Sequence, residues 1–298
     1  KFDLGYSGLG NNSLYNYLKN KGHDINDAIS IGLVKKSKNK ENEFYDFFRN
    51  RLIFPIKDHK SNIIAFGGRA LDNSNIKYIN SSDSSIFKKS FQLYNLDLAI
   101  EENRKPKDLI IVEGYMDVIT LYQNNFKSSV APLGTALTNY QLQRAWKVCE
   151  SPIIMFDGDE AGQKAAQRVA NLALSILSPD NSLRFCLLPK DYDPDDYLKR
   201  HKISSLHNMI DNALPLSEFI WLSEIEREDI SIPEKKAGFE TRIKALSKRI
   251  SNITVRDYYN KFFDEKLSVL KFNKNVSKNS KFNYRTGRIS SEILTSDR

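Results

Sequence analysis

Two carboxylates separated by one glycine follow an apolar run at residues 152–156 of this 298-residue chain. They are Asp157 and Asp159, with Gly158 between them. Side chains two positions apart on an extended chain point the same way, and like charges held that close repel unless a cation neutralises them. An Asp-x-Asp pair also occurs in ordinary turns, but the preceding apolar strand favours a site for a hard divalent cation such as Mg²⁺.

Acidic residues also follow two other apolar runs. Glu113 and Asp117 come after residues 109–112, and three acids come after residues 183–188, namely Asp193, Asp195 and Asp196. Glu113 alone is equally typical of a helix N-terminus, where the dipole stabilises negative charge, and the last group is equally typical of a solvated turn. Three acidic clusters that each follow a strand predict a site for metal and phosphate.

The strands and helices that position these acids follow from the hydrophobic pattern. The expected strands lie at 109–112, 129–133, 152–156 and 183–188, and the expected helices at 115–124, 138–149 and 161–177. The second helix opens on a capping box formed by Thr138 and Gln141. Apolar strands that alternate with helices indicate a parallel sheet covered on both faces. Ligands bind such sheets at the carboxyl ends of the strands, where all three acidic clusters fall.

Composition limits the class of protein without identifying it. Hydrophobic residues make up 40% of the chain, enough for the cores of about two domains, and the net charge of +8 is only weak evidence for a polyanionic partner. Cys149 and Cys186 are expected to be small buried residues of a cytosolic protein, and the four histidines lack zinc-ligand spacing. No apolar run reaches the length of a membrane span.

The segments on either side of this strand–helix region have patterns of their own. Residues 53–56 and 63–66 predict a β-hairpin within a basic, glycine-punctuated segment. Residues 201–270 carry apolar positions at helical spacing and predict a small helical bundle, whereas residues 271–298 predict a disordered tail or linker. Because the chain begins at Lys1 and stops in polar sequence, we expect it to be an excised piece of a longer protein.

A Glu after one strand and Asp-x-Asp after a later one resemble the toprim domain of primases, topoisomerases and some nucleases. The resemblance to bacterial DnaG-type primases is closer and covers residues 1–200, because several long motifs occur in the order of that family. They include Glu-Gly-Tyr-Met-Asp at 113–117 and Asp-Gly-Asp-Glu-Ala-Gly at 157–162, with further matches at 49–56, 64–69, 77–81, 134–138 and 193–197.

The resemblance implies a role for each matching residue. Glu113, Asp157 and Asp159 correspond to the catalytic ligands of Mg²⁺, for which Mn²⁺ is an alternative, and Asp117, Asp193, Asp195 and Asp196 correspond to secondary acids. The resemblance also implies that template and nucleotide contact seven further residues, namely Arg51, Arg69, Lys77, Asn80, Lys88, Lys89 and Tyr115. The family's zinc-binding module and helicase-binding domain have no counterpart in this sequence.

The expected fold is therefore α/β (α+β overall) in four parts. Residues 1–104 form a basic N-terminal α/β subdomain, 105–200 a toprim catalytic domain with a parallel sheet flanked by helices, 201–270 a helical subdomain, and 271–298 a tail or linker. The expected activity is synthesis of RNA primers from ribonucleoside triphosphates on single-stranded DNA, in the cytoplasm. The resemblance implies a monomer that meets the replicative helicase through a domain absent from this sequence and does not bind a membrane.

Three alternatives remain for a toprim-containing chain. A topoisomerase or nuclease is one, although a topoisomerase also needs a nucleophilic tyrosine in a large separate domain. A helicase–primase fusion carries a P-loop, which this sequence lacks. A non-enzymatic recombination mediator carries a zinc site of four cysteines, whereas this chain has two cysteines.

Overall fold

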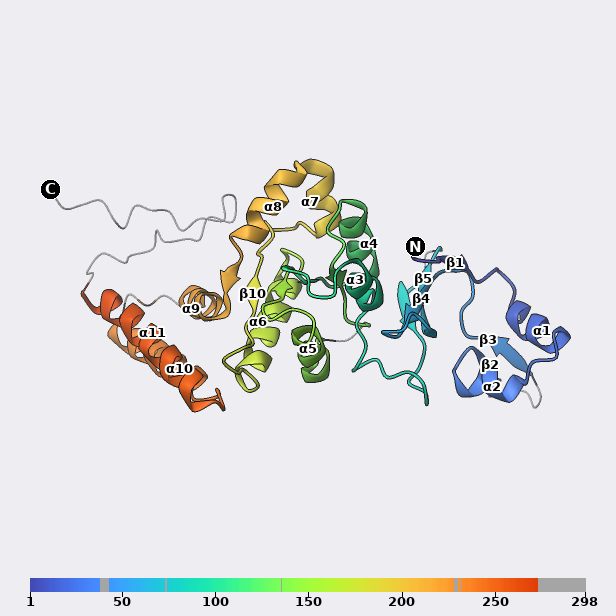
Figure 1. The fold of residues 1–298 in the computed structure, drawn as a ribbon, viewed down its shortest axis with the longest axis horizontal. Helices are drawn as coiled ribbons and strands as arrows, with labels where there is room; N and C mark the ends of the chain where they lie inside the picture. Colours follow the sequence, from blue (N-terminus) through green and yellow to red (C-terminus); the bar gives the residue numbers. More distant parts are fainter. Residues whose placement is uncertain (38–42, 73, 135, 228–229, 231, 273–298) are drawn as a thin grey trace.

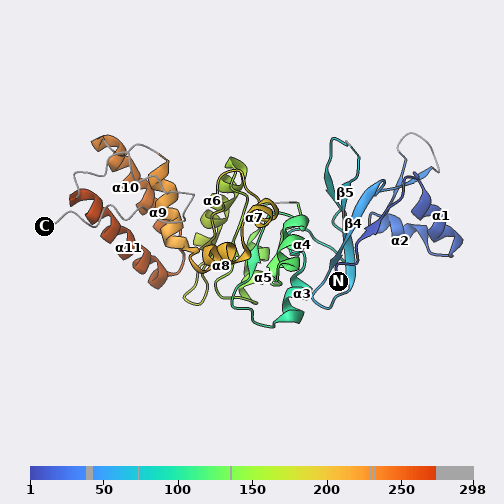
Figure 2. The same cartoon turned by 90° about the horizontal axis from the view of Figure 1, so that it is seen from above.

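The structure is a computed structural model that describes residues 1–37, 43–72, 74–134, 136–227, 230 and 232–272. Residue 135 of the motif at 134–138 and residues 273–298 of the predicted tail lie outside this description. The described part is elongated, with a sheet and its helices between a β-rich region formed by the N-terminal residues and a group of helices formed by the C-terminal ones (Figures 1 and 2).

A five-stranded sheet occupies the middle of the molecule, in the order β11-β10-β9-β7-β8. Its strands are β7 (Ile110–Ile111), β8 (Ser129–Val130), β9 (Ile153–Ile154), β10 (Arg184–Phe185) and β11 (Leu214–Pro215). The first four are parallel, as the sequence predicts, and are shorter than the apolar runs that contain them. The antiparallel edge strand β11 contradicts the prediction of a helix there, because the residue before a proline is pushed toward extended backbone.

Alternate residues of the strands enter two separate cores on the two faces of this sheet. Leu109 and Ile111 belong to the first core, whereas Ile110 and Val112 belong to the second. The first core also contains residues of α5 (Asn139–Trp146) and α6 (Glu160–Leu174), and the second contains residues of α4 (Tyr115–Gln123), α7 (Pro194–Arg200) and α8 (Ile203–Asp211). Both faces are covered, which confirms the prediction and explains why the strands are continuously apolar.

The helix that follows β8 begins where its capping box predicts. The Thr138 hydroxyl accepts the Gln141 backbone N–H at 3.2 Å, and the Gln141 side chain accepts the Thr138 N–H at 2.9 Å. Two of the unpaired N–H groups at the helix start are satisfied by this exchange. The three helices expected between the strands are present, and each ends one to three residues earlier than predicted.

The N-terminal region is built on an antiparallel sheet in the order β1-β4-β5-β6. The predicted hairpin is confirmed as its two central strands, β4 (Arg51–Lys57) and β5 (Ile63–Ala70), flanked by β1 (Gly5–Tyr6) and β6 (Tyr78–Asn80). A smaller unit between β1 and β4 contains α1 (Ser13–Asn20), α2 (Ile25–Ser30), β2 (Val34–Lys36) and β3 (Phe44–Asp46). The buried Asp46 carboxylate accepts the N–H groups of Leu14 and Tyr15 and so joins β3 to the start of α1.

The remaining helices complete the first core. Helix α3 (Leu96–Glu102) precedes the five-stranded sheet, and α9 (Leu216–Glu226), α10 (Pro233–Ser247) and α11 (Ile253–Phe272) follow it. Phe239 of α10 and Phe263 of α11 are almost fully buried in the same core as the sheet residues. None of the helices in the described residues has the length and apolar character needed to cross a membrane.

Candidate functional site

Glu113 and Asp157 meet at the carboxyl edge of the sheet because they follow the adjacent parallel strands β7 and β9. The Asp157 backbone N–H donates to a Glu113 carboxylate oxygen at 3.1 Å. Gly162 in the first turn of α6 packs against both, since a Cβ there would lie 2.2 Å from the Asp157 carbonyl oxygen and 2.8 Å from Glu113 Oε1. Only a glycine allows the helix to begin this close to the two acids.

Asp159 is held by the helix that it starts. It is the N-cap of α6, and its carboxylate accepts the Gly162 N–H at 2.7 Å. The unpaired N–H groups and the dipole of a helix N-terminus both favour a negative charge at that position. One oxygen of Asp159 is therefore engaged by the cap, and the other can act as a ligand.

Gly158, between Asp157 and Asp159, packs against the segment that follows β10. The Gly158 N–H donates to the Tyr192 carbonyl oxygen at 2.8 Å. A Cβ at position 158 would lie 2.0 Å from the Pro189 carbonyl oxygen. Contacts between backbone atoms therefore position the two acids, and these contacts leave no room for a side chain at position 158.

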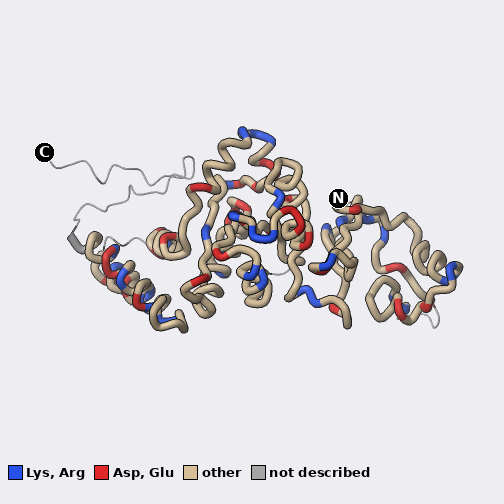
Figure 3. The backbone as a smooth tube through the Cα atoms, viewed as in Figure 1, with Lys and Arg blue, Asp and Glu red and all other residues tan. Residues whose placement is uncertain are grey.

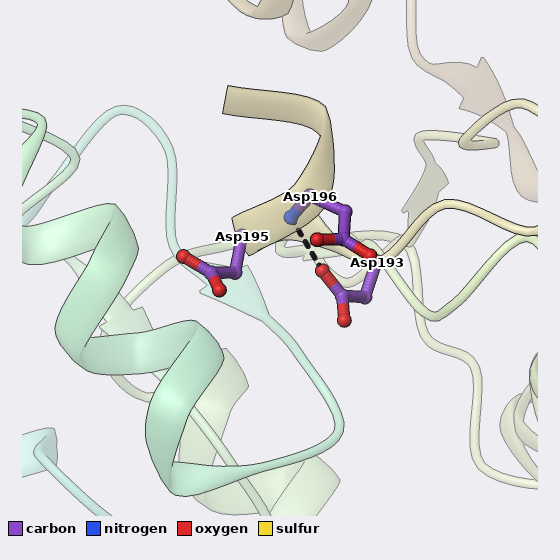
Figure 4. Close-up of side chains that lie close together, drawn as sticks. All are labelled: Asp193, Asp195 and Asp196. Carbon is purple, nitrogen blue, oxygen red and sulfur yellow. Dashed lines mark hydrogen bonds between the residues drawn. The ribbon is translucent and has the colours of Figure 1, made fainter. Parts of the chain in front are cut away.

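Asp193, Asp195 and Asp196 form the tightest acidic group in the described residues, with one oxygen of each within 4.8 Å of the others (Figure 4). Asp193 caps α7 and accepts the Asp196 N–H at 2.6 Å. Asp195 accepts the Thr120 hydroxyl at 3.1 Å and pairs with Lys199. The carboxylate oxygens of Glu113, Asp157 and Asp159 do not all lie this close to one another. The sequence nevertheless predicts these three residues as the primary ligands.

Burial and mutual repulsion raise the pKa values of three acids at this edge. Burial raises the pKa of Asp157 to about 8, and the charge of Glu113 adds to the effect. Burial raises the pKa of Asp117 to about 7, with a further contribution from Asp193. The pKa of Glu113 is also raised, chiefly by burial. Carboxylates that repel in this way are stabilised in their charged forms by a cation.

The residues present fit a divalent cation. Asp157 Oδ1 is buried and has no hydrogen-bond partner among the described residues, and such an atom is costly to bury unless something else binds it. The neighbouring side chains offer carboxylate oxygens, which are the ligands that hard divalent cations prefer. Asp117 is engaged differently, because its carboxylate accepts the Gly114 N–H at 3.0 Å and stabilises the start of α4.

Arg51 has a structural position that the sequence does not indicate. Only 9% of its surface is exposed, and its guanidinium donates to the carbonyl oxygens of Gly68, Ile76 and Lys77 at 3.1–3.3 Å. It therefore ties β4 to β5 and to the segment before β6. Arg51 thus has a structural role, and its predicted contact with nucleic acid stays a prediction.

Tyr115 is likewise buried, with 5% of its surface exposed. Its ring stacks on Phe54 with centroids 4.9 Å apart, and its hydroxyl donates to Asn80 Oδ1 at 2.6 Å. A Cβ on Gly67 would lie 2.7 Å from this ring, so the glycine is required for the fit. The side chain therefore holds Asn80 in place, and the predicted contact of Tyr115 with template or nucleotide stays a prediction.

The other predicted basic residues lie on the N-terminal sheet and on the loop that follows it. Arg69 of β5 lies over the ring of Tyr78 on β6, with its guanidinium carbon 5.9 Å from the centroid. Lys77 and Lys88 are exposed, and Lys89 is half-buried. The sheet and loop that carry these residues contribute Phe54, Ala65 and Phe87 to the second core, to which the acid-bearing strands also contribute.

Two polar residues make contacts that the sequence does not predict. Thr120 supports Asp195, as described above, and lies three residues after Asp117, on the same side of α4. Gln141 is signalled by its capping box, but its second function is not. Its amide donates to the carbonyl oxygens of Lys89 and Gln92 at 2.9 and 2.8 Å and so fixes the basic loop from a distant part of the chain.

Acids at the carboxyl edge of a parallel sheet, beside an antiparallel sheet with basic residues, define a toprim-type site for nucleic-acid chemistry. Comparison with known proteins agrees with this class. A family model described as the N-terminal domain of the DNA primase catalytic core matches residues 1–100, and a Toprim-like model matches residues 110–198.

Individual relatives identify the family. A DNA primase of Rickettsia typhi is 36% identical over 267 residues, which cover 90% of this chain and 44% of that protein. The structure of the Escherichia coli primase catalytic core is 34% identical with a TM-score of 0.80, over 89% of this chain and 84% of that one. A DnaG primase catalytic domain bound to single-stranded DNA is 33% identical with a TM-score of 0.78, over 89% and 84%.

The chain belongs to the DnaG-type bacterial primase family and corresponds to its catalytic core. The predicted family and the predicted fold class are both confirmed. The chain spans about half the length of the curated relatives it matches.

Proposed function

We propose that this chain synthesises short RNA primers on a single-stranded DNA template. The observation that carries the proposal is the set of buried acids at the carboxyl edge of the sheet, with Asp157 Oδ1 lacking a hydrogen-bond partner in the described residues, in a member of this family. A related catalytic domain bound to single-stranded DNA supports the choice of template. In this reaction the primer 3′-oxygen bonds to the α-phosphorus of a ribonucleoside triphosphate, and pyrophosphate leaves.

Glu113, Asp157 and Asp159 would hold the divalent cation, with Mg²⁺ as the expected ion and Mn²⁺ as the alternative. When bound, the cation supplies charge neutralisation of the triphosphate and activation of the primer hydroxyl. Asp159 is oriented by the helix start that it caps. The group formed by Asp193, Asp195 and Asp196 lies after the neighbouring strand and is the candidate for a second cation at the same edge.

Each part of the chain would have a separate role in this reaction. Residues 1–104 would bind template and nucleotide through Arg69, Lys77, Lys88 and Lys89, with Asn80 held by Tyr115. Residues 105–200 would carry the chemistry, and residues 201–270 would support the sheet through the first core. We assign the protein to the cytoplasm as a monomer, and contact with the replicative helicase to a domain outside this sequence.

The test is primer synthesis in vitro. The chain is incubated with single-stranded DNA, labelled ribonucleotides and Mg²⁺ or Mn²⁺, and the products are separated on a gel. We expect metal-dependent short RNA from the parent chain and at least a 100-fold loss, on the order expected for removing charge stabilisation at the reacting groups, in the Asp157→Asn/Asp159→Asn double variant. Asparagine is also a good N-cap, so α6 should still form.

A pre-annealed RNA primer separates initiation from polymerisation. Extension of that primer without synthesis of new primers would place the defect in initiation and leave the polymerase proposal standing. No product with either metal and either substrate would overturn it, and cleavage or passive binding of nucleic acid would then be measured on the same DNA.

A further inference from the structure

An aromatic pair stacks on the surface beside the basic loop. The rings of Phe91 and Tyr140 lie with centroids 4.2 Å apart and planes inclined by 22°. Both remain exposed, Phe91 to 42% and Tyr140 to 55%. Phe91 belongs to the loop between β6 and α3, whereas Tyr140 is in the first turn of α5. Two large rings that stack without being buried present apolar faces to solvent, where a third ring can add to the stack.

The pair is held by a built contact between two segments about fifty residues apart. The fully buried Gln141 donates to the carbonyl oxygens of Lys89 and Gln92, at 2.9 and 2.8 Å. The Thr138 hydroxyl donates to the Ser90 carbonyl oxygen at 2.6 Å. The backbone carbonyl groups of residues 89, 90 and 92 are thus all hydrogen-bonded to the start of α5, which fixes the backbone on both sides of Phe91. The orientation of Phe91 is therefore fixed by the start of α5.

Basic residues lie near this aromatic pair. Lys88 and Lys89 come three and two residues before Phe91, and Arg144, one turn after Tyr140, donates to the carbonyl oxygen of Phe91 at 3.3 Å. Figure 3 shows lysine and arginine on the loop between β6 and α3. One acid, Asp83, lies in this loop close to Lys89, and its carboxylate accepts the Lys89 N–H at 3.0 Å. Aromatic faces next to cations are the combination that binds single-stranded nucleic acid.

The aromatic pair lies on the side of the sheet where the acids gather. Helix α5 follows β8, so its first turn begins at the carboxyl edge that also carries Glu113 and Asp157. The connection between β8 and α5 passes Asn80, because a Cβ on Gly134 would lie 2.7 Å from Asn80 Nδ2. Gly134, in the connection that leads to the helix of Tyr140, therefore lies against Asn80, which is one of the residues proposed to bind template or nucleotide.

We propose that Phe91 and Tyr140 form a stacking platform for an unpaired base of a single-stranded nucleic acid, with Lys88 and Lys89 binding the flanking phosphates. The proposal rests on the proposed function, since it names a part of the strand-binding surface of the same enzyme. It is separate from the chemistry, because stacking on this platform requires neither a nucleotide triphosphate nor a metal ion.

The test measures binding to two labelled strands of equal length by fluorescence anisotropy. One strand is oligothymidine, and the other has the same sugars and phosphates but no bases. We expect the Phe91→Ala/Tyr140→Ala variant to bind oligothymidine about 5- to 150-fold more weakly than the parent, the range for loss of base stacking. Its binding to the strand without bases should be unchanged. Phe91→Tyr and Tyr140→Phe should retain the parent affinity for both strands.

Two controls make the result specific. Tyr258→Ala removes a ring that is 71% exposed on α11 and should leave both affinities unchanged. Lys89→Ala should weaken binding to both strands and reduce the slope of log affinity against log salt by about 1, whereas the aromatic double variant should keep the parent slope.

Equal weakening on the two strands by the aromatic double variant would overturn the proposal, since it would show that the rings only shape the loop. So would an unchanged affinity for oligothymidine. A separate titration measures binding of a fluorescent ATP analogue. Weakened binding of this analogue alone, with strand binding intact, would assign the platform to the incoming nucleotide and would also overturn the proposal. Because the strand-binding assay contains no metal ion and no nucleotide triphosphate, failure of primer synthesis does not affect its outcome.

Discussion

Asp157 is the residue where burial and neighbouring charge act together on one carboxyl group. Its Oδ1 is buried without a hydrogen-bond partner in the described residues, and its pKa is raised to about 8 by burial first and by Glu113 second. A proton and a cation are therefore alternative ways to neutralise this group. In the absence of metal the proton occupies it over much of the neutral range, and a cation must displace that proton.

The raised pKa predicts how pH affects the stability of the metal-free protein. In the unfolded chain this carboxyl group loses its proton near the ordinary aspartate pKa of 3.8, whereas the folded group keeps its proton until about pH 8. Between pH 3.8 and about pH 8 the folded state binds more protons than the unfolded state, so the free energy of unfolding falls as pH rises. The stability that the protonated group contributes is fully present below pH 3.8 and is lost as pH rises through about 8. Asp157→Asn removes the ionisation, and we expect its advantage in Tm over the parent to grow across this window by about 2–6 °C.

Thermal unfolding in chelator at several pH values, from about 5 to 9, measures this difference. Asp211→Asn is the matched aspartate-to-asparagine control, because Asp211 is an exposed acid at the end of α8. A parent and an Asp157→Asn variant whose Tm values run parallel would show that Asp157 ionises normally in the fold.

At the scale of elements, the site depends on how closely α6 begins to the strands. The first turn of this helix packs on the Asp157 carbonyl oxygen and on Glu113, with Gly162 at the contact. Asp159 caps the same turn. The position of two of the acids is therefore tied to the position of one helix start, and a small displacement of the helix separates the carboxylates.

Gly162→Ala tests this dependence. The added methyl group would overlap backbone and the Glu113 carboxylate, so we expect a stability loss of about 1–3 kcal/mol and a loss of primer synthesis larger than the loss of folded protein. Gly238→Ala in α10 is the matched control. Its new Cβ would have only Arg242 Nη1 nearby, at 3.5 Å, and alanine should raise stability by about 0.5–1 kcal/mol. Urea unfolding and primer extension are measured on both variants. Parent activity in Gly162→Ala would show that the position of α6 does not control the acids.

Some of these elements could be predicted from the sequence and others could not. The parallel sheet, the hairpin and the cap at Thr138 depend on local or periodic patterns, and each was predictable. The edge strand β11 was not, because Pro215 favours extended backbone at Leu214 but does not indicate pairing with β10, which lies about thirty residues earlier. The contacts of Arg51 and Tyr115 were not predictable either, because their partners, such as Gly68 and Asn80, are distant in sequence and no spacing rule identifies them.

At the scale of the whole molecule, the second core joins the N-terminal sheet to the acid site. It contains Phe54 and Ile56 of β4 together with Val112 and Tyr115 around the first acid. The first core instead joins the opposite face of the central sheet to the C-terminal helices. Both cores stabilise the molecule, but only the second lies between the basic sheet and the strand ends. The two cores should therefore differ in their effect on activity.

Two fully buried phenylalanines allow that comparison, Phe54 in the second core and Phe239 in the first. We expect Phe→Leu at either position to lower the free energy of unfolding by about 1–2 kcal/mol, since most of the buried volume is kept. Phe54→Leu should in addition weaken substrate use, because Phe54 stacks on the Tyr115 ring that holds Asn80.

The comparison is made by primer extension at a temperature where urea titrations show both variants to be folded. An increase in KM for nucleotide or template of about 5-fold or more in Phe54→Leu, the size of a displaced hydrogen-bonding group, with parent values in Phe239→Leu, would connect the second core to the site. Equal kinetics in two equally destabilised variants would mean that packing supports the fold alone, and that Tyr115 holds Asn80 in place without the Phe54 ring beneath it.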